Sequence, residues 1–233
     1  MKLFSIAVFL LLCMGTYAQE RFNKIIYDID GNIGNTVIAG DDGYVVPTGS
    51  LANGERDIAF TKLDLQGNVV LQKKYRKDDY LCLEGKYNCM KYDSLHNTYY
   101  MCGIAITYDY ATRYPFIVEI NQDLDTIFFN IIEIDSIYAV FDVLKLSDTT
   151  YGIACQALLP DDIEMGLLIY NTNGTVSRYG YGVPEGVSET GRQIIRTTNN
   201  EILLGGFSFG FNSGNYAQDW YLVKTDSIGN LIW

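Results

Sequence analysis

Short segments in which apolar and polar residues alternate follow one another along the chain, separated by turns rich in Asp, Asn and Gly. Residues 57–63 (DIAFTKL) show the alternation that a half-buried β-strand requires. Apart from the apolar run at residues 3–12, no long stretch shows the apolar period of a helix. The pattern therefore predicts an all-β chain.

One phrase recurs in this pattern: a strand end, an acidic or amide residue, a few further residues that usually include Gly, and another strand. It reads FTKLDLQGNVV at residues 60–70 and LVKTDSIGNLI at residues 222–232, with looser copies at 118–127 and 169–176. The four anchors of the phrase, which lie 57, 50 and 55 residues apart, are Asp64, Asn121, Asn171 and Asp226. A period of about 50 residues predicts a repeat array.

Each repeat divides into four short segments of strand character. In the first repeat these segments are residues 36–39, 43–46, 57–63 and 68–75. The units expected on this basis are residues 32–75, 86–131, 139–181 and 192–233. Four antiparallel strands per unit predict a β-propeller-like repeat of about four four-stranded blades. A two-sheet sandwich is the main alternative, but it does not explain the internal period.

The phrases DDGYVVPTGS, DIAFTKLDLQGNVVLQKKY, NNEILLGGFSFG and DWYLVKTDSIGNLIW resemble the blades of exported β-propeller-like repeat proteins of Bacteroidetes-type bacteria. The resemblance extends over about residues 32–233 and is closest in the first and last units. It implies a propeller fold and export. Many members of this group carry a C-terminal sorting domain for type IX secretion, which this sequence does not show, and no catalytic motif defines the group.

Four units allow either the smallest closed ring or an incomplete propeller. The last unit has only the beginning of a fourth strand before Trp233, whereas residues 21–27 have strand character and precede the first unit. One hypothesis is that residues 21–27 supply the missing outer strand of the last blade. The other is that the chain is a truncated propeller from which further blades are missing.

Residues 1–18 have the parts of a secretory signal peptide. Lys2 precedes the apolar run, and Ala18 provides the small residue needed for cleavage. The run is too short to span a bilayer, and no later stretch is long enough, so no transmembrane segment is expected after the signal peptide is removed. A lipid anchor on Cys13 is the alternative, although the small residues that usually precede a lipidated cysteine are missing. Residues 19–233 are expected to form the secreted or cell-surface repeat domain.

The formal net charge of −11 gives the chain no basic surface for a phosphate backbone, so nucleic acid is not an expected partner. Four cysteines follow the leader, namely Cys82, Cys89, Cys102 and Cys155. Cys102 and Cys155 lie in segments that read as inner strands and are expected to be buried. Cys82 and Cys89 could close a loop by a disulfide in an oxidising compartment, although pairing cannot be read from sequence.

The sequence contains few residues that could form a catalytic or metal-binding site. His96, the only histidine, is expected to be a solvent-exposed turn residue because no orienting partner is evident. The paired acids that could serve glycoside hydrolysis, although turn positions are the simpler explanation, are Asp41, Asp42, Asp78, Asp79, Asp161 and Asp162. Residues 28–32 (DIDGN) resemble the opening of a calcium loop but lack its spacing. No metal, cofactor or catalytic residue is therefore predicted.

Five triplets of Asp, Ser or Thr and a following residue resemble the O-glycosylation acceptor of exported Bacteroidetes-type proteins. They begin at Asp93, Asp125, Asp135, Asp148 and Asp226. Ordinary turns explain these triplets equally well. Tyrosines together with Trp220 and Trp233 could form a sugar-stacking surface, but their spacing favours packing within the core.

These observations favour a secreted or cell-surface, non-enzymatic β-propeller that binds an unidentified protein or glycan ligand. The alternative is an extracellular glycan-acting hydrolase, for which acids from several blades should gather in one cleft.

Overall fold

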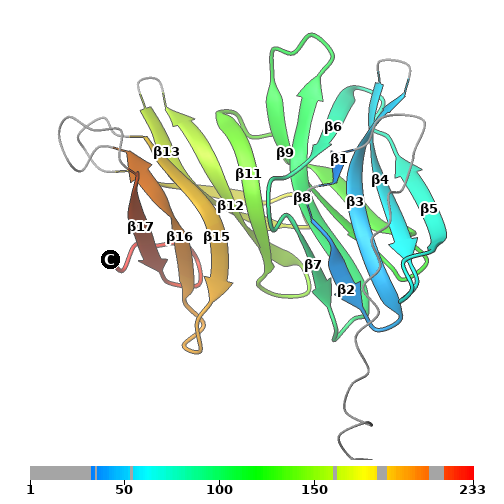
Figure 1. Ribbon diagram of the computed structural model, residues 1–233. Coiled ribbons are helices and arrows are strands. Elements are labelled where there is room, and N and C mark those ends of the chain that lie inside the picture. The colour runs from blue at the N-terminus through cyan, green and yellow to red at the C-terminus, as the bar shows by residue number, and fades with distance from the viewer. Residues whose placement is uncertain (1–32, 35, 53–54, 160–161, 183–187, 210–217) are drawn as a thin grey trace, which may run out of the picture.

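The computed structural model describes residues 33–34, 36–52, 55–159, 162–182, 188–209 and 218–233. The regular elements of these residues are all β-strands, arranged in four antiparallel sheets (Figure 1). None of the described residues forms a helix that is long and apolar enough to cross a membrane. The predicted leader at residues 1–18 and the possible closing strand at residues 21–27 lie outside the described residues.

The strands follow the chain from sheet to sheet. Sheet 1 contains β1 (Ile33–Gly34), β2 (Ile38–Gly40), β3 (Gly43–Ala52), β4 (Glu55–Leu63) and β5 (Val69–Tyr75). Sheet 2 contains β6 (Tyr80–Glu84), β7 (Met90–Asp93), β8 (Thr98–Thr107), β9 (Arg113–Ile120) and β10 (Thr126–Ile131). Sheet 3 contains β11 (Ile137–Lys145), β12 (Thr150–Leu159), β13 (Asp162–Asn171) and β14 (Val176–Tyr181). Sheet 4 contains β15 (Glu189–Arg196), β16 (Ile202–Phe209) and β17 (Gln218–Thr225).

Within each sheet the strands pair in the order in which they follow along the chain, as in a propeller blade. The first position is occupied by one strand in sheets 3 and 4, but it is divided between β1 and β2 in sheet 1 and between β6 and β7 in sheet 2. In sheet 4, Leu231 forms a bridge with Thr225, so that the start of a fourth strand lies beside β17. The recurring order confirms the predicted β-propeller-like fold and excludes the two-sheet sandwich.

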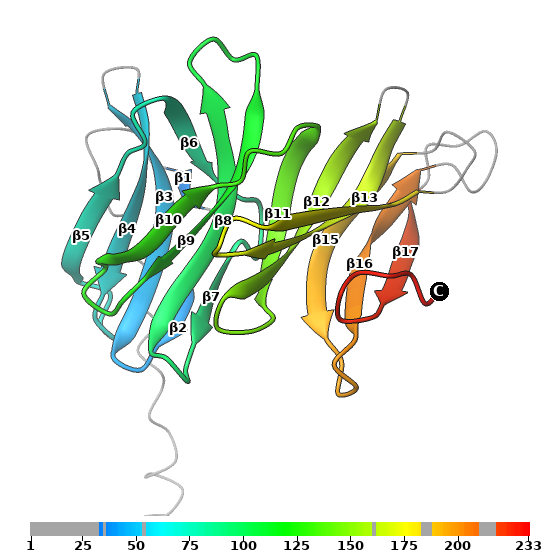
Figure 2. The same cartoon turned by 180° about the vertical axis from the view of Figure 1, so that it is seen from behind.

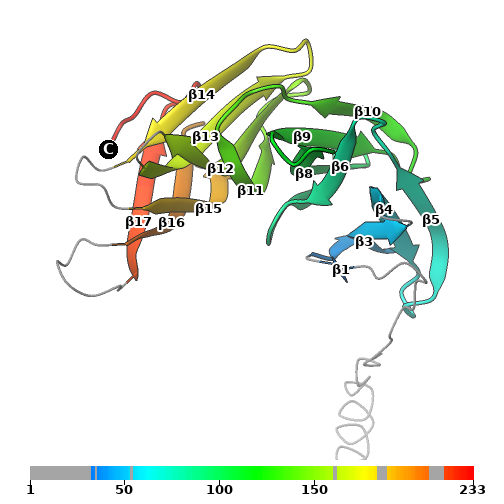
Figure 3. The same cartoon turned by 90° about the horizontal axis from the view of Figure 1, so that it is seen from above.

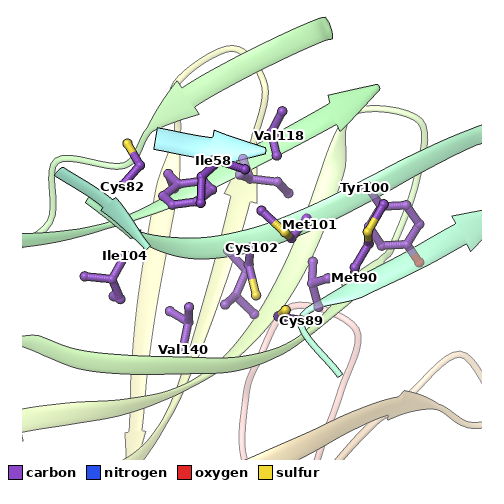
Figure 4. Close-up of a cluster of buried hydrophobic side chains, with 14 of the residues drawn as sticks. Ile58, Cys82, Cys89, Met90, Tyr100, Met101, Cys102, Ile104, Val118 and Val140 are labelled. Carbon is purple, nitrogen blue, oxygen red and sulfur yellow. The ribbon is translucent and has the colours of Figure 1, made fainter. Parts of the chain in front are cut away.

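The four sheets form an arc, with sheet 1 and sheet 4 at its ends (Figure 3). The first strands β1, β6, β11 and β15 lie on the inner side of this arc, whereas β5, β10 and β14 lie on its outer side (Figures 2 and 3). Apolar residues fill the space between neighbouring sheets, and the larger core extends from sheet 1 to sheet 3 (Figure 4). A smaller core joins sheets 3 and 4 through residues such as Met165, Leu167 and Leu204. Sheet-on-sheet packing of this kind buries most of the apolar strand residues and is the main source of stability.

The recurring sequence phrase corresponds to the turn between the third and fourth strands of each sheet. The Oδ1 atom of Asp64 accepts hydrogen bonds from the backbone N–H groups of Gln66 and Asn68, at 2.9 and 2.7 Å. Asp226 accepts the equivalent bonds from Ile228 and Asn230, at 3.0 and 2.8 Å. The phrase recurs because a short polar side chain that binds its own turn is needed once in each sheet.

Candidate functional site

The inner strands of three sheets are interrupted at corresponding places. The register of β11 skips one residue at Phe141, and that of β15 skips one residue at Arg192. In sheet 2 the pairing with β8 is interrupted between β6 and β7, where Tyr87 adopts a left-handed φ of 60°. An extra residue in a strand bends the backbone and redirects its side chain, so each interruption can turn a residue out of the sheet.

The redirected side chains of Tyr87, Phe141 and Arg192 meet. The rings of Tyr87 and Phe141 stack with their centroids 6.2 Å apart and an interplanar angle of 14°. The guanidinium carbon of Arg192 lies 4.7 Å from the centroid of Tyr87 and 4.5 Å from that of Phe207 on β16. The backbone N–H of Lys86 donates to the carbonyl oxygen of Val140 at 3.0 Å and fixes the loop against sheet 3. Three sheets thus contribute to one cluster of aromatic and cationic groups.

A cavity of about 700 Å³ lies between this cluster and sheet 4. It is lined by Tyr87, Asn88, Arg192, Gln193, Gly205, Gly206, Phe207, Gln218, Asp219, Trp220 and Leu222. The Oδ2 atom of Asp219 and the Nε atom of Arg192 are buried without a hydrogen-bond partner among the described residues. The cavity therefore combines an exposed aromatic wall with the guanidinium group of Arg192 and the exposed amide side chains of Gln193 and Gln218.

Trp220 is the most exposed large apolar side chain of this cavity, at 91%. It lies six residues before the turn anchor Asp226, a position that Ile58 and Met165 occupy before the anchors of sheets 1 and 3. Ile58 and Met165 are fully buried, and Met165 belongs to the core that joins sheets 3 and 4. Sheet 4 thus presents to the cavity a face that sheets 1 and 3 use for packing.

A second cavity, of about 340 Å³, lies between the inner strands of sheets 2 and 3. It is lined by Leu81, Leu83, Glu84, Gly85, Lys86, Ile104, Ile106, Tyr110, Arg113, Tyr138, Ala139 and Val140. Gly85 and Lys86 border this cavity, whereas Tyr87 and Asn88 border the larger one, so the loop between β6 and β7 separates the two.

A polar network joins sheets 2 and 3 beside the turn between β7 and β8. Lys145 forms ion pairs with Asp93 at 2.9 Å and Glu119 at 3.0 Å, and Glu119 also accepts a hydrogen bond from Tyr151. Burial acts to raise the pKa of Asp93, but hydrogen bonds from Lys145 and His96 outweigh it and lower that pKa to about 2. Burial raises the pKa of Tyr151 strongly, and its hydrogen bond to Glu119 raises it further. Every charged group named here has a partner, which is typical of a structural network.

His96 lies in the turn between β7 and β8, with its side chain 40% exposed. The expectation that it has no orienting partner is wrong, because its Nδ1 atom lies 2.8 Å from Asp93 and its Nε2 atom 3.4 Å from Asp148. The partners are both carboxylates, and this arrangement supplies no nucleophile for a catalytic triad.

The paired acids whose side chains are described, Asp41, Asp42, Asp78 and Asp79, line neither cavity. Asp41 and Asp42 lie in the turn between β2 and β3, where Asp42 pairs with Lys62 at 2.9 Å. Asp78 and Asp79 lie in the tight turn before β6. Asp161 is outside the described residues, as are residues 28–32, and only the backbone of Asp162 at the start of β13 is described. Among the described residues, no group of three or more His, Cys, Asp or Glu side chains could hold a metal ion.

The four described cysteines are buried and free of disulfide bonds, so Cys82 and Cys89 do not form the disulfide that the sequence allows. Cys82 pairs with Ala105, whereas the carbonyl oxygen of Cys89 accepts a hydrogen bond from the N–H of Cys102. Although β6 and β7 are close in sequence, they pair with different parts of β8, which places Cys82 and Cys89 apart in the core (Figure 4).

Comparison with known proteins finds similar solved structures but does not place the chain in a protein family. No protein-family model matches the chain, and no curated protein matches it in sequence. The chain is similar to the endo-arabinase from Bacteroides thetaiotaomicron VPI-5482 at 11% identity and a TM-score of 0.47, over 82% of this chain and 72% of that one. It is also similar to the protein BT0996, solved as a complex with RGII, at 11% identity and to a "Glycoside hydrolase" at 10% identity. Both of these similarities have a TM-score of 0.47 and cover 87% of this chain and 72% of the other.

These comparisons correct the expectation that the chain is not an enzyme, because an endo-arabinase and a glycoside hydrolase are among the structures that it resembles. The expectation depends on the absence of a catalytic motif from the sequence. That inference is too strong, since residues that share a site on a repeat fold come from different blades and leave no local motif. A likeness of fold assigns no reaction, and the groups that act here must be argued from the cavity itself.

Proposed function

We propose that this chain is an extracellular glycan-acting hydrolase and that it holds a sugar ring in the cavity between Tyr87 and sheet 4. One observation carries the proposal: Trp220, 91% exposed, shares a cavity of about 700 Å³ with Asp219 and Arg192. The volume lies within the range of small-molecule sites, about 300–1,000 Å³.

The lining of the cavity suits a carbohydrate. The indole ring of Trp220 offers an apolar face on which the C–H face of a sugar ring can stack, and its neighbour Leu222 extends that surface. Gln193 and Gln218, both exposed, together with Asn88 bring amide groups that can hydrogen-bond to sugar hydroxyls. A glycan therefore finds an apolar platform and polar groups in one place.

Hydrolysis of a glycosidic bond usually requires two carboxyl groups. Asp219 lines the cavity, and its cross-strand partner Ser208 is also paired with Glu189 on the next strand. The Ser208 hydroxyl donates to Glu189 at 3.1 Å, so the three residues form one row across sheet 4. Two strand spacings place the backbones of Asp219 and Glu189 about 9.5 Å apart. In this proposal Asp219 is the carboxyl-bearing residue of the cavity lining, whereas Glu189 is fully buried, lines neither cavity and is assigned no role in the reaction.

The test is a screen of plant and bacterial polysaccharides in which both binding and the release of reducing ends are measured. Trp220→Ala is expected to weaken binding about tenfold or more. Asp219→Asn is expected to lower the release of reducing ends about 100-fold or more with binding retained. Asp148→Asn is the matched control, because its side chain is 81% exposed and lies outside both cavities.

Two results would overturn the proposal. One is that no polysaccharide binds or is cleaved. The other is a dimer in sedimentation analysis that Trp220→Ala dissociates, because a second copy would then cover the face that the proposal assigns to a sugar.

A further inference from the structure

We infer that the glycan bound in this cavity carries a carboxylate, as uronic acid residues do, and that Arg192 binds it. This inference rests on the proposed function and adds the chemical class of the sugar. It is independent of the residues that carry out the reaction.

Arg192 is held in place without being neutralised. The rings of Tyr87 and Phe207 lie 4.7 and 4.5 Å from its guanidinium carbon and fix the plane of the group. No ion pair of Arg192 with a described residue occurs, and its Nε atom is buried without a hydrogen-bond partner. Other cations of the chain have carboxylate partners, as Lys62, Lys91 and Lys145 do.

An unpaired arginine in the cavity of such an acidic chain indicates a negatively charged ligand. The formal net charge is −11, so carboxylates are abundant, yet none among the described residues pairs with this guanidinium. Aromatic rings on Arg192 exclude water, which strengthens its interaction with an incoming anion. The planar guanidinium matches a carboxylate by two parallel hydrogen bonds.

The neighbouring residues select a sugar as the carrier of that anion. Trp220 and Arg192 line the same cavity, so one ring can stack on the indole while its substituent reaches the guanidinium. A free carboxylate without a ring would leave Trp220 uncovered, and a neutral sugar would leave Arg192 unpaired. A uronic acid residue satisfies both groups.

The experiment compares a galacturonic acid trimer with its methyl ester, which lacks the negative charge, and with a sulfated galactose trimer. Each is titrated calorimetrically in 50 mM and 300 mM NaCl, between which the Debye length falls from about 14 Å to about 6 Å. The acid is expected to bind about tenfold or more tightly than the ester at the lower salt concentration. Arg192→Gln is expected to abolish this preference while the affinity for the ester is retained. Arg192→Lys should restore part of the preference, because it returns the charge without the planar group.

Arg196→Gln is the matched control. It removes the same charge from the same strand, but Arg196 is exposed and donates to the Lys145 carbonyl oxygen at 3.0 Å, away from the cavity. Equal affinities for acid and ester would overturn this inference alone, as would an equal loss of preference in Arg196→Gln. Binding of the sulfated trimer but not of the acid would also overturn it. Failure of all three sugars to bind would overturn this inference, whereas the proposed function is overturned only when no polysaccharide of the screen binds or is cleaved.

Discussion

The guanidinium carbon of Arg192 lies 4.7 Å from the centre of the Tyr87 ring, although Arg192 belongs to sheet 4 and Tyr87 precedes a strand of sheet 2. The contact exists because both residues leave the regular pairing of an inner strand at corresponding places. Phe141, at the same place in sheet 3, stacks on Tyr87 from the sheet between them. Interruptions of the inner strands, rather than the strands themselves, thus build the wall of the cavity.

Asp142 is expected to be the residue whose loss most weakens the packing of sheets 2, 3 and 4. It is 1% exposed, pairs with Lys91 of β7 at 2.8 Å and accepts a hydrogen bond from the N–H of Ile194 in β15 at 3.0 Å. Asp142→Ala leaves a half-buried cation and a buried donor unpaired and should lower the free energy of unfolding by about 3–5 kcal/mol. Urea denaturation measures this loss. Asp142→Asn, which keeps an acceptor, should lose less, and equal losses in the two variants would contradict the explanation.

Asp93 is expected to make the protein sensitive to acid. Its pKa in the folded chain is about 2, below the value of 3.8 for an unperturbed Asp, so the folded state binds this proton less readily than the unfolded state does. The resulting stabilisation is present above about pH 4 and is lost as the pH falls towards 2. Unfolding free energies measured across this interval should fall more steeply for the wild type than for Asp93→Asn. Identical slopes would show that Asp93 is not stabilised in this way.

Gly205 and Gly206, adjacent on β16, are expected to respond differently to substitution. A Cβ atom at Gly206 would lie 1.8 Å from the Thr190 carbonyl oxygen, whereas one at Gly205 would meet only Leu222, at 3.6 Å. Gly206→Ala should therefore destabilise the fold by about 1–3 kcal/mol, and Gly205→Ala should leave the stability nearly unchanged. Because Gly205 lines the cavity, Gly205→Phe should fold and block sugar binding. A Gly205→Phe protein that binds sugar like the wild type would place the ligand elsewhere.

The four described cysteines are expected to be unreactive in the folded protein. Burial raises the pKa values of Cys82, Cys89 and Cys155 to about 12 and raises that of Cys102 as well. At neutral pH the nucleophilic thiolate is therefore scarce, and access is blocked too. Alkylation with iodoacetamide, followed by peptide mapping, should label these positions only after denaturation. Any of them that stays unlabelled in denaturant without a reductant would indicate a disulfide.

The sequence predicts the fold well because its strongest pattern is local. Asp64 and Asp226 bind the backbone of their own turns, so the requirement for each residue is visible within a few positions. The short strand β6 is not predicted, since its residues Tyr80–Glu84 follow a turn without a clear alternation.

The candidate site cannot be predicted in the same way. Tyr87, Arg192 and Trp220 come from distant parts of the chain, and a register skip in β15 directs Arg192 into the cavity. Residues that meet in space but lie far apart in the chain leave no local pattern in the sequence. A residue skipped in the pairing of a strand leaves none either. The spacing of Trp220 favours a core position because the same strand position packs inward in other repeats, and only the structure shows that it is exposed.

The central claim is that Trp220 forms the platform for a bound sugar. The chain has two tryptophans, so Trp233→Phe leaves Trp220 as the sole indole reporter. Titration of this variant with the glycan that binds the protein in the screen should shift the emission to shorter wavelength in a saturable way, as the ligand removes water from the indole. Unchanged emission throughout a titration in which calorimetry shows binding would contradict the account.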